Sequence, residues 1–159
     1  MPLLETSRKQ QSELIAALSK IGHEGAINYH YARVTVKGTA LIEPIGIPVV
    51  WNNATSAYEV YVAQDIAAVA GTPSAPNGAP IALVVGAAEY VGSNKADVQL
   101  VAGGVELNVL FRGEGAVKEA GIVWGAAAAP AQAAFRLQLE KQGLAVVANS
   151  TVASPVFTA

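Results

Sequence analysis

The chain contains no cysteine and few charged residues among its 159 positions. Without cysteine it can form neither disulfides nor thiolate metal sites, although this leaves the compartment open. Charged residues make up 14% of the sequence, well under the ~25% of an average protein. So few charges leave little with which to cover the surface, and we expect part of the apolar surface to contact another protein.

Basic residues are scarce and scattered as well. Lys and Arg together number 10, the formal net charge is −2, and no run of basic residues occurs. Because phosphate backbones are held by clustered cations, this composition disfavours nucleic-acid binding. Gly, Pro or charge interrupts every apolar stretch before the ~18 residues of a membrane span. The N-terminus has no apolar segment behind a basic start, so we expect neither a secretory signal nor a membrane partner.

Apolar residues are plentiful: they make up 52% of a chain whose length suits one domain. A chain of this size buries roughly 70% of its unfolded surface on folding. We therefore expect a substantial core and no disorder over the whole length.

Residues 1–22 have a different pattern from the rest of the chain. Leu14, Leu18 and Ile21 fall at i, i+4 and i+7, which is one helical stripe, and Gly22 is a plausible stop. The stripe is narrow, so such a helix is marginal alone in water. Two interpretations stay open: a short helix docked on its own domain, or an arm that orders on a partner. Residues 23–159 are expected to form a single β-rich domain.

From about residue 25 the hydrophobic period changes to two, which indicates strands. Val34 and Val36 lie on one side of a half-buried strand, whose other side carries Arg33, Thr35 and Lys37. The run IALVVGA predicts a strand buried on both faces, while NNATS predicts a turn and AGTPSAPNGAP an irregular loop. The proline of IGIPVVW suits a sheet edge or a strand start. Further short strands are expected in AYEVYVA, ADVQLV, VELNVLF, GIVWG and LAVVANSTV.

One helix is predicted between Pro130, which suits a first helical turn, and Gly143, which suits the position after the last. Its core-facing stripe is Ala131, Phe135 and Leu139 with Ala134 beside them, while Glu140, Lys141 and Gln142 lie mostly away. The expected fold is therefore α+β and mostly β. It is a compact β-barrel or sandwich-like domain with one main helix in its C-terminal half and an N-terminal arm.

The segment FRGEGAVKEAGIVWG, residues 111–125, brings glycines together as a phosphate-binding loop does. A G-x-G-x-x-G fingerprint would need its third glycine where Lys118 stands, and a G-x-x-x-x-G-K-[ST] loop is absent. No long helix follows whose N-terminus could face a phosphate. We therefore expect Gly113, Gly115 and Gly121 to turn the chain between strands, and we expect no cofactor.

No pattern assembles side chains for metal binding or catalysis. His23 and His30 are seven apart with no cysteine nearby, which disfavours a metal pair completed by a carboxylate such as Glu24. No G-x-S-x-G elbow occurs. The twelve acidic residues are scattered, with Asp97 near Lys95. The sequence predicts no catalytic, cofactor-binding or metal-binding residue and no enzyme.

The heaviest side chains are Trp51 and Trp124, and each closes an apolar strand segment. They can fill the core or the end of a barrel, or they can anchor an interface, where tryptophan is enriched. Together with the helical stripe they make up the candidate interface residues, which are Leu14, Leu18, Ile21, Trp51 and Trp124.

Four segments follow one another along the chain: PNGAPIALVVG, VLFRGEGAV, GIVWG and FRLQLEKQGLAVV…SPVF. In this the chain resembles the head decoration (capsid-cementing) proteins of tailed bacteriophages, the broad group that includes lambda-type decoration proteins. The likeness runs from roughly Ile45 to the C-terminus, and VLFRG and AAFRLQLEKQG match best. None of these motifs is catalytic. The chain is longer than the smallest lambda-type members, especially over residues 1–45.

Members of this group are small, β-rich and cysteine-poor, and they add to an assembled shell, often as trimers with an N-terminal segment lying on the capsid. The resemblance implies a structural protein of the capsid exterior, made in the host cytoplasm, with the major capsid protein and its own copies as partners. Two alternatives also fit the residues. One is a phage tail or baseplate component, and the other is a small-molecule-binding β-barrel or cofactor-free enzyme.

Overall fold

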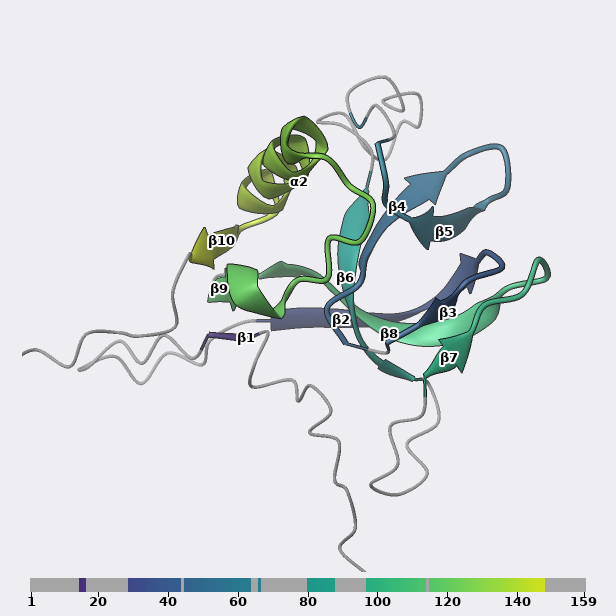
Figure 1. Cartoon of the computed structure of the whole chain (residues 1–159). Helices are drawn as coiled ribbons and strands as arrows, with labels where there is room; N and C mark the ends of the chain where they lie inside the picture. Colours follow the sequence, from purple (N-terminus) through teal and green to yellow (C-terminus); the bar gives the residue numbers. More distant parts are fainter. Residues whose placement is uncertain are drawn as a thin grey trace, which may run out of the picture.

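The computed structural model of the chain consists mainly of strands, packed with one α-helix among the residues that it describes (Figure 1). These residues are 15–16, 29–43, 45–63, 66, 80–87, 97–113 and 115–147. The predicted class, α+β and mostly β, is confirmed, and the β-structure takes the form of a closed barrel. Leu14, Leu18 and Ile21 lie outside the described residues, as does nearly all of AGTPSAPNGAP.

Five strands close the barrel in the order β2-β5-β4-β6-β8. Their bounds are β2 Tyr29–Lys37, β4 Pro48–Asn52, β5 Ala57–Val60, β6 Ile81–Ala87 and β8 Val105–Gly113. Neighbours pair antiparallel except β2 and β5, which close the barrel through the parallel pairs Val36–Tyr58 and Lys37–Glu59. Pro48 begins a strand that is paired on both sides, so the strand-start interpretation holds and the edge interpretation does not.

Side chains from all five strands fill the barrel interior. Alternation along β2 buries Val36 completely and leaves Arg33 and Thr35 exposed, as predicted. β3 (Leu41–Ile42) and β7 (Val98–Gln99) pair as a separate two-stranded ribbon, the β3–β7 ribbon. The buried interior residues, with two from the ribbon and its flank, are Val36, Ile42, Ile47, Val49, Ala82, Val84, Leu100, Leu107 and Val109, and Tyr58 and Val60 of β5 pack on them.

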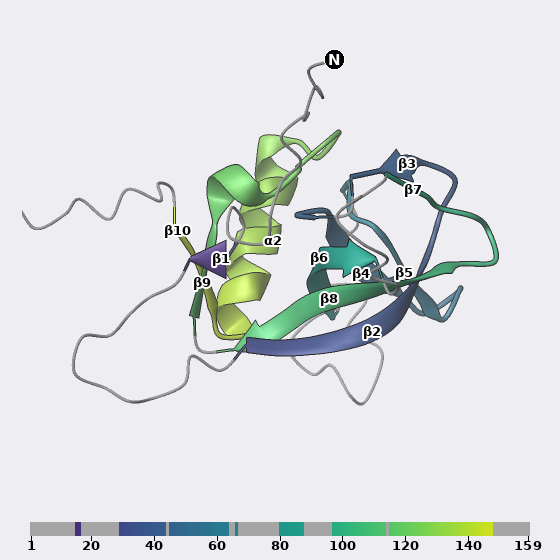
Figure 2. The ribbon, with the colours of Figure 1, turned by 90° about the horizontal axis from the view of Figure 1, so that it is seen from below.

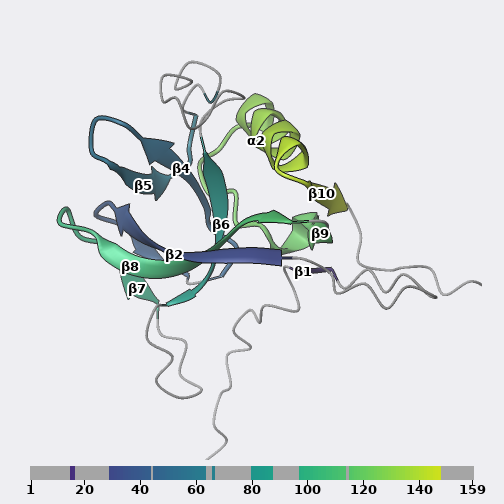
Figure 3. The same cartoon turned by 180° about the vertical axis from the view of Figure 1, so that it is seen from behind.

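A second layer lies beside the barrel (Figures 1 and 2). It comprises β1 Ile15–Ala16, β9 Gly115–Lys118, the 3-10 turn η1 Glu119–Gly121, α2 Ala129–Lys141 and β10 Leu144–Val147. β9 is the middle strand of a small sheet and pairs antiparallel with β1 and parallel with β10. Seen from behind, α2 lies on the same side of the barrel as this sheet (Figure 3).

β6 is shared by the two hydrophobic clusters that the described residues form. Ile81, Leu83 and Val85 pack with the residues of α2 and the small sheet, while Ala82 and Val84 point into the barrel. All five side chains are at most 2% exposed. The prediction of a strand buried on both faces is therefore confirmed, and β6 holds the barrel and the second layer together.

The helical prediction for the N-terminal stripe is wrong at Ile15 and Ala16, which form β1. They pair with Val117 and Ala116 on the side of β9 that β10 leaves open. An open strand edge offers a row of backbone N–H and C=O groups. A narrow helical stripe is too weak to compete with that pairing.

The strand predicted at GIVWG is also absent, because residues 121–125 form the end of η1 and an irregular segment. This segment crosses close to Gly46, where an added Cβ would lie 2.0 Å from the carbonyl oxygen of Gly121. Gly46 also has a φ of +90°, which favours glycine. Glycine therefore suits this position because it lacks a side chain that would clash and because it tolerates the positive φ. Val123 N–H donates to the carbonyl of Gly46 at 2.8 Å, which fixes the crossing without a strand ladder.

The predicted helix is confirmed as α2, with Pro130 in its first turn and Gly143, at a φ of +87°, just after its end. Phe135 and Leu139 are fully buried and Ala131 is partly so, but Ala134 is exposed. No helix in the described part of the chain is long and apolar enough to cross a membrane.

Gln142 was expected to point away from the core, and this is wrong. Its side-chain amide donates to the carbonyl of Ile81 at 2.9 Å and to the carbonyl of Phe111, and its Oε1 accepts from Ile81 N–H at 3.3 Å. Ile81 and Phe111 lie on the neighbouring strands β6 and β8. The side chain therefore supplies the polar partners that these strands do not give each other, and it ties the end of α2 to the barrel.

Replacing Gln142 by Leu is expected to lower the free energy of unfolding by roughly 2 kcal/mol, because three backbone groups lose their partner. Urea unfolding measures this difference. Glu140→Leu is the matched control: Glu140 is exposed on the same helix, and its replacement should change stability by only about 0.5 kcal/mol. Equal stability of the two variants would contradict the bridging role of Gln142.

Candidate functional site

Trp124 lies against α2 and packs on the hydrophobic cluster that the helix covers. Its ring meets Phe135 edge-on, with centroids 5.7 Å apart and planes at 87°. The guanidinium of Arg136 lies 5.2 Å from the Trp124 ring centroid, which is a cation–π contact. These contacts join the segment before α2 to the helix, and they favour the packing interpretation of this tryptophan.

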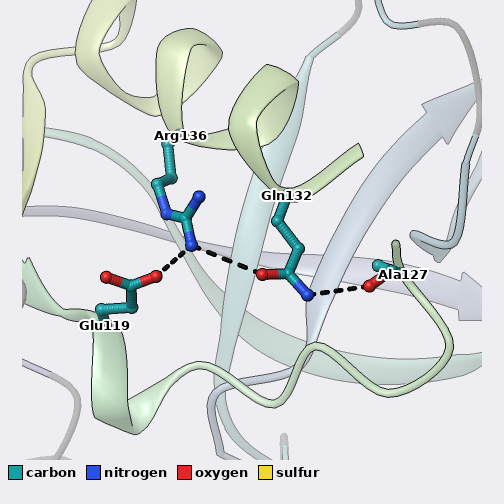
Figure 4. Close-up of polar contacts among 4 residues, drawn as sticks. All are labelled: Glu119, Ala127, Gln132 and Arg136. Atoms are coloured by element: carbon teal, nitrogen blue, oxygen red, sulfur yellow. Dashed lines mark hydrogen bonds and ion pairs between the residues drawn. The ribbon is translucent and has the colours of Figure 1, made fainter. Parts of the chain in front are cut away.

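Arg136 also centres a polar network around the start of α2, which Figure 4 shows. It forms an ion pair with Glu119 of η1 and donates to Gln132 Oε1 at 3.4 Å. Gln132 in turn donates to the carbonyl of Ala127 at 2.8 Å. Trp124 Nε1 and Arg136 Nε are buried with no hydrogen-bond partner among the described residues. Both members of the ion pair are partly exposed, so the network positions η1 and α2 more than it stabilises them.

Trp51 lies at the opposite end of β4 from Pro48, beside the turn at residues 53–56. It is two residues from Val49 and so shares the face that points into the barrel. Its ring meets Tyr58 edge-on, with centroids 5.4 Å apart, and its Nε1 donates to Asn53 Oδ1 at 2.7 Å. The ring is only partly buried. Trp51 therefore covers this end of the barrel and still presents surface to solvent.

Polar side chains brace the hairpin between β4 and β5 on its other face. The Glu59 carboxylate accepts from Asn52 Nδ2 at 3.1 Å and from Thr55 Oγ1 at 3.0 Å. Lys37 Nζ donates to the carbonyl of Thr55 at 2.9 Å and so connects the hairpin to β2. Each donor and acceptor serves the turn itself, and the cluster is therefore structural.

The chain turns at Gly113 and Gly115, as predicted, but it makes a corner and not a hairpin. β8 ends at Gly113 in the barrel, and β9 begins at Gly115 in the small sheet. Gly113 N–H donates to the carbonyl of Gln142 at 3.2 Å, and Gly115 N–H to that of Gly143 at 3.4 Å. Backbone amides that could hold a phosphate are thus engaged with the chain's own carbonyls.

The remaining titratable candidates lie apart. His30 is exposed on β2, with its ring 6.2 Å from that of Phe111, and Asp97 is exposed next to β7. His23, Glu24 and Lys95 lie outside the described residues. Within the described ranges, no three His, Asp or Glu side chains gather as metal ligands do.

Large apolar side chains exposed to solvent are the feature that sequence patterns missed. Leu41 in β3 is 62% exposed, Val101 just after β7 is 46% exposed, and Leu137 on α2 is 55% exposed. Tyr31 and Val62 are exposed as well. Leu137 lies two residues after Phe135 and two before Leu139, so the turn of the helix points it away from the buried stripe. The best candidates for function are therefore surfaces that contact other proteins.

The two tryptophans should respond differently to truncation. Trp124→Ala removes the ring through which the segment between η1 and α2 packs on the helix. This should lower the free energy of unfolding by roughly 3 kcal/mol. Trp51→Ala opens only the solvated end of the barrel and should cost about 1 kcal/mol. Urea unfolding followed by circular dichroism compares them. A larger loss for Trp51 would reverse the assignment.

Burial raises the pKa of the Tyr58 hydroxyl above its ordinary value of 10.0. The folded state keeps this proton where the unfolded state loses it, so the contribution of Tyr58 to stability is complete below pH 10.0 and is lost as the pH rises through the folded-state pKa. We expect a smaller alkaline loss of stability in Tyr58→Phe than in the wild type. Denaturant titrations at several pH values measure the difference, and parallel curves would contradict it.

Comparison with known proteins places the chain in no family. No protein-family model matches it, and no curated protein matches it. A proposal about function therefore rests on the fold, on the exposed side chains and on the resemblance carried by the sequence motifs.

Proposed function

We propose that this chain is a structural protein of a tailed phage particle, which binds the outside of the assembled capsid as a homotrimer and stabilises it without catalysing a reaction. The observation that carries the proposal is the set of large apolar side chains exposed at separate places on a β-rich domain. The resemblance of VLFRG and AAFRLQLEKQG to decoration proteins points to the major capsid protein as the partner.

The placement of the exposed side chains supports a protein with more than one partner surface. Leu41 belongs to the β3–β7 ribbon and Val101 follows β7 by two residues, whereas Leu137 belongs to α2 on the other side of the molecule (Figure 1). A decoration protein has to contact both its own copies and the shell. Separate apolar surfaces at separate elements suit that double task.

Packing inside the barrel favours this role over uptake of a small molecule. A ligand-binding barrel holds its ligand in a cavity lined by inward-pointing side chains. Here Val49, Val84, Leu107 and Val109 meet in that interior and are fully buried. The barrel interior is therefore packed with the protein's own side chains, and partners would bind the outer surface.

Stabilisation of a shell requires only selective binding. A protein that binds the closed shell and not its separated subunits shifts the assembly equilibrium toward the shell. Each copy need contribute only on the order of a few kcal/mol, because many copies act on one shell and an oligomer engages several sites at once. Arg33 and Arg136 already pair with Glu106 and Glu119, so we expect mainly apolar and backbone contacts with the shell.

Shells that carry the protein should survive heating or osmotic shock better than bare shells, at both low and high salt. Apolar contacts carry no charge for salt to screen, so binding should fall only modestly as salt rises. The measurement is the fraction of intact particles after each stress, counted by electron microscopy.

An unrelated protein at equal mass concentration controls for crowding, which stabilises compact states only slightly. Co-sedimentation with intact shells and with separated capsid subunits tests selectivity. Equal survival of decorated and bare shells would reject the cementing role, and loss of binding in high salt would reject the apolar contacts.

A further inference from the structure

The outer face of the β3–β7 ribbon combines apolar and acidic side chains. The register pairs Leu41 with Gln99 and Ile42 with Val98. Continued by one residue beyond the paired strands, it places Glu43 opposite Asp97. Because side chains alternate, Leu41 and Glu43 share the outer face with Asp97, and Ile42 turns inward. Val101 is the diagonal neighbour of Leu41 on the same face, a spacing over which side chains still touch.

Two carboxylates therefore stand opposite each other at one end of this face. Like charges in facing positions repel, and no cation of the described chain forms an ion pair with Glu43 or Asp97. Beside them lie Leu41 and Val101, which are 62% and 46% exposed. Within the described residues the face thus presents an apolar patch bordered by two carboxylates that form no ion pair, and a partner with the opposite arrangement would complement it.

α2 carries that opposite arrangement. Leu137 is 55% exposed, and Lys141 follows it at i+4, on the same side of the helix and also exposed. Ala133 and Ala134 on the preceding turn are exposed and small, so they leave room for an approaching surface. Glu140 borders Leu137 on the other flank.

The two surfaces lie at opposite ends of the molecule. In Figures 1 and 2 the β3–β7 ribbon and α2 stand on either side of the barrel, so one copy cannot bring its own two surfaces together. A second copy can do so. Contact between unlike surfaces of successive copies is head-to-tail, and it closes into a ring when the rotation between copies allows.

We infer that copies of this chain associate head-to-tail, with Leu137 and Lys141 of one copy on the β3–β7 ribbon of the next. In this contact Leu137 covers Leu41 and Val101, and the Lys141 ammonium lies between the carboxylates of Glu43 and Asp97. The inference rests on the self-association in the proposed function and specifies which surfaces meet.

Charge argues against the symmetric alternatives. Ribbon on ribbon would bring Glu43 and Asp97 of one copy to the same carboxylates of the other. Helix on helix leaves those carboxylates unneutralised, although it could pair Lys141 of one copy with Glu140 of the other. Of these arrangements, only the head-to-tail contact places Lys141 against the ribbon carboxylates and covers Leu41, Val101 and Leu137 together.

Charge reversal on each side, and on both sides together, tests this contact. Lys141→Glu alone and the double variant Glu43→Lys/Asp97→Lys should each raise the dissociation constant of the oligomer about tenfold or more, because like charges then face each other. The triple variant combines all three substitutions, restores opposite charges across the contact and should recover association. Sedimentation velocity over a micromolar concentration series measures all four proteins, and circular dichroism confirms that each is folded.

Two single variants serve as controls. Arg112→Glu changes the net charge as much as Lys141→Glu does, at an exposed position on β8, and should leave association unchanged. Glu140→Lys should leave it unchanged or tighten it. Weakening by Glu140→Lys would indicate helix-on-helix pairing and overturn the head-to-tail contact.

The remaining outcomes separate this inference from the proposed function. An oligomer that ignores all the ribbon and helix variants would overturn this contact and leave self-association standing. A wild-type chain that stays monomeric at every concentration would overturn both the contact and self-association, while the shell-survival measurement would still decide the cementing role.

Discussion

The fold depends on the burial of β6 on both of its faces. Ala82 and Val84 complete the barrel interior, and Ile81, Leu83 and Val85 form the floor on which α2 and the small sheet pack. Detaching the second layer from the barrel would expose one face of this strand to water. The barrel and the second layer must therefore fold as one cooperative unit. The register shift between Val84 and Gly86 against β8 bends the strand where the two layers diverge.

Where the barrel and the second layer meet, some backbone groups have no partner on a neighbouring strand. Side chains supply the missing hydrogen bonds there. Gln142 supplies hydrogen bonds to β6 and β8, and the Tyr61 hydroxyl donates to the carbonyl of Ala131 at 2.8 Å at the start of α2. Tyr61 also packs on Phe135, with ring centroids 5.0 Å apart. The two ends of the helix are therefore each tied to the barrel by side-chain hydrogen bonds, through Tyr61 at the start and Gln142 at the end.

Local patterns in the sequence predict the elements well and their partners poorly. The period of two in β2, the unbroken apolar run of β6 and the bounds of α2 follow from propensity, alternation and capping. The pairing of Ile15–Ala16 with β9, the irregular course of residues 121–125 and the inward turn of Gln142 do not, because each depends on a neighbour that is distant in sequence. The exposed surfaces were missed for the same reason: exposure of Leu41 depends on which face of the β3–β7 ribbon the barrel covers.

The exposed apolar side chains fall into two groups, which would let one small domain bind two kinds of partner. In the proposed ring, the contact between successive copies covers Leu41, Val101 and Leu137. Tyr31 and Val62 are the other large apolar side chains that are exposed in the described chain, at 49% and 41%. They lie on the barrel, at β2 and just after β5, and neither belongs to the ribbon or to α2. Contacts with the shell would then fall to residues that the ring leaves open, so shell binding and self-association should be separable by substitution.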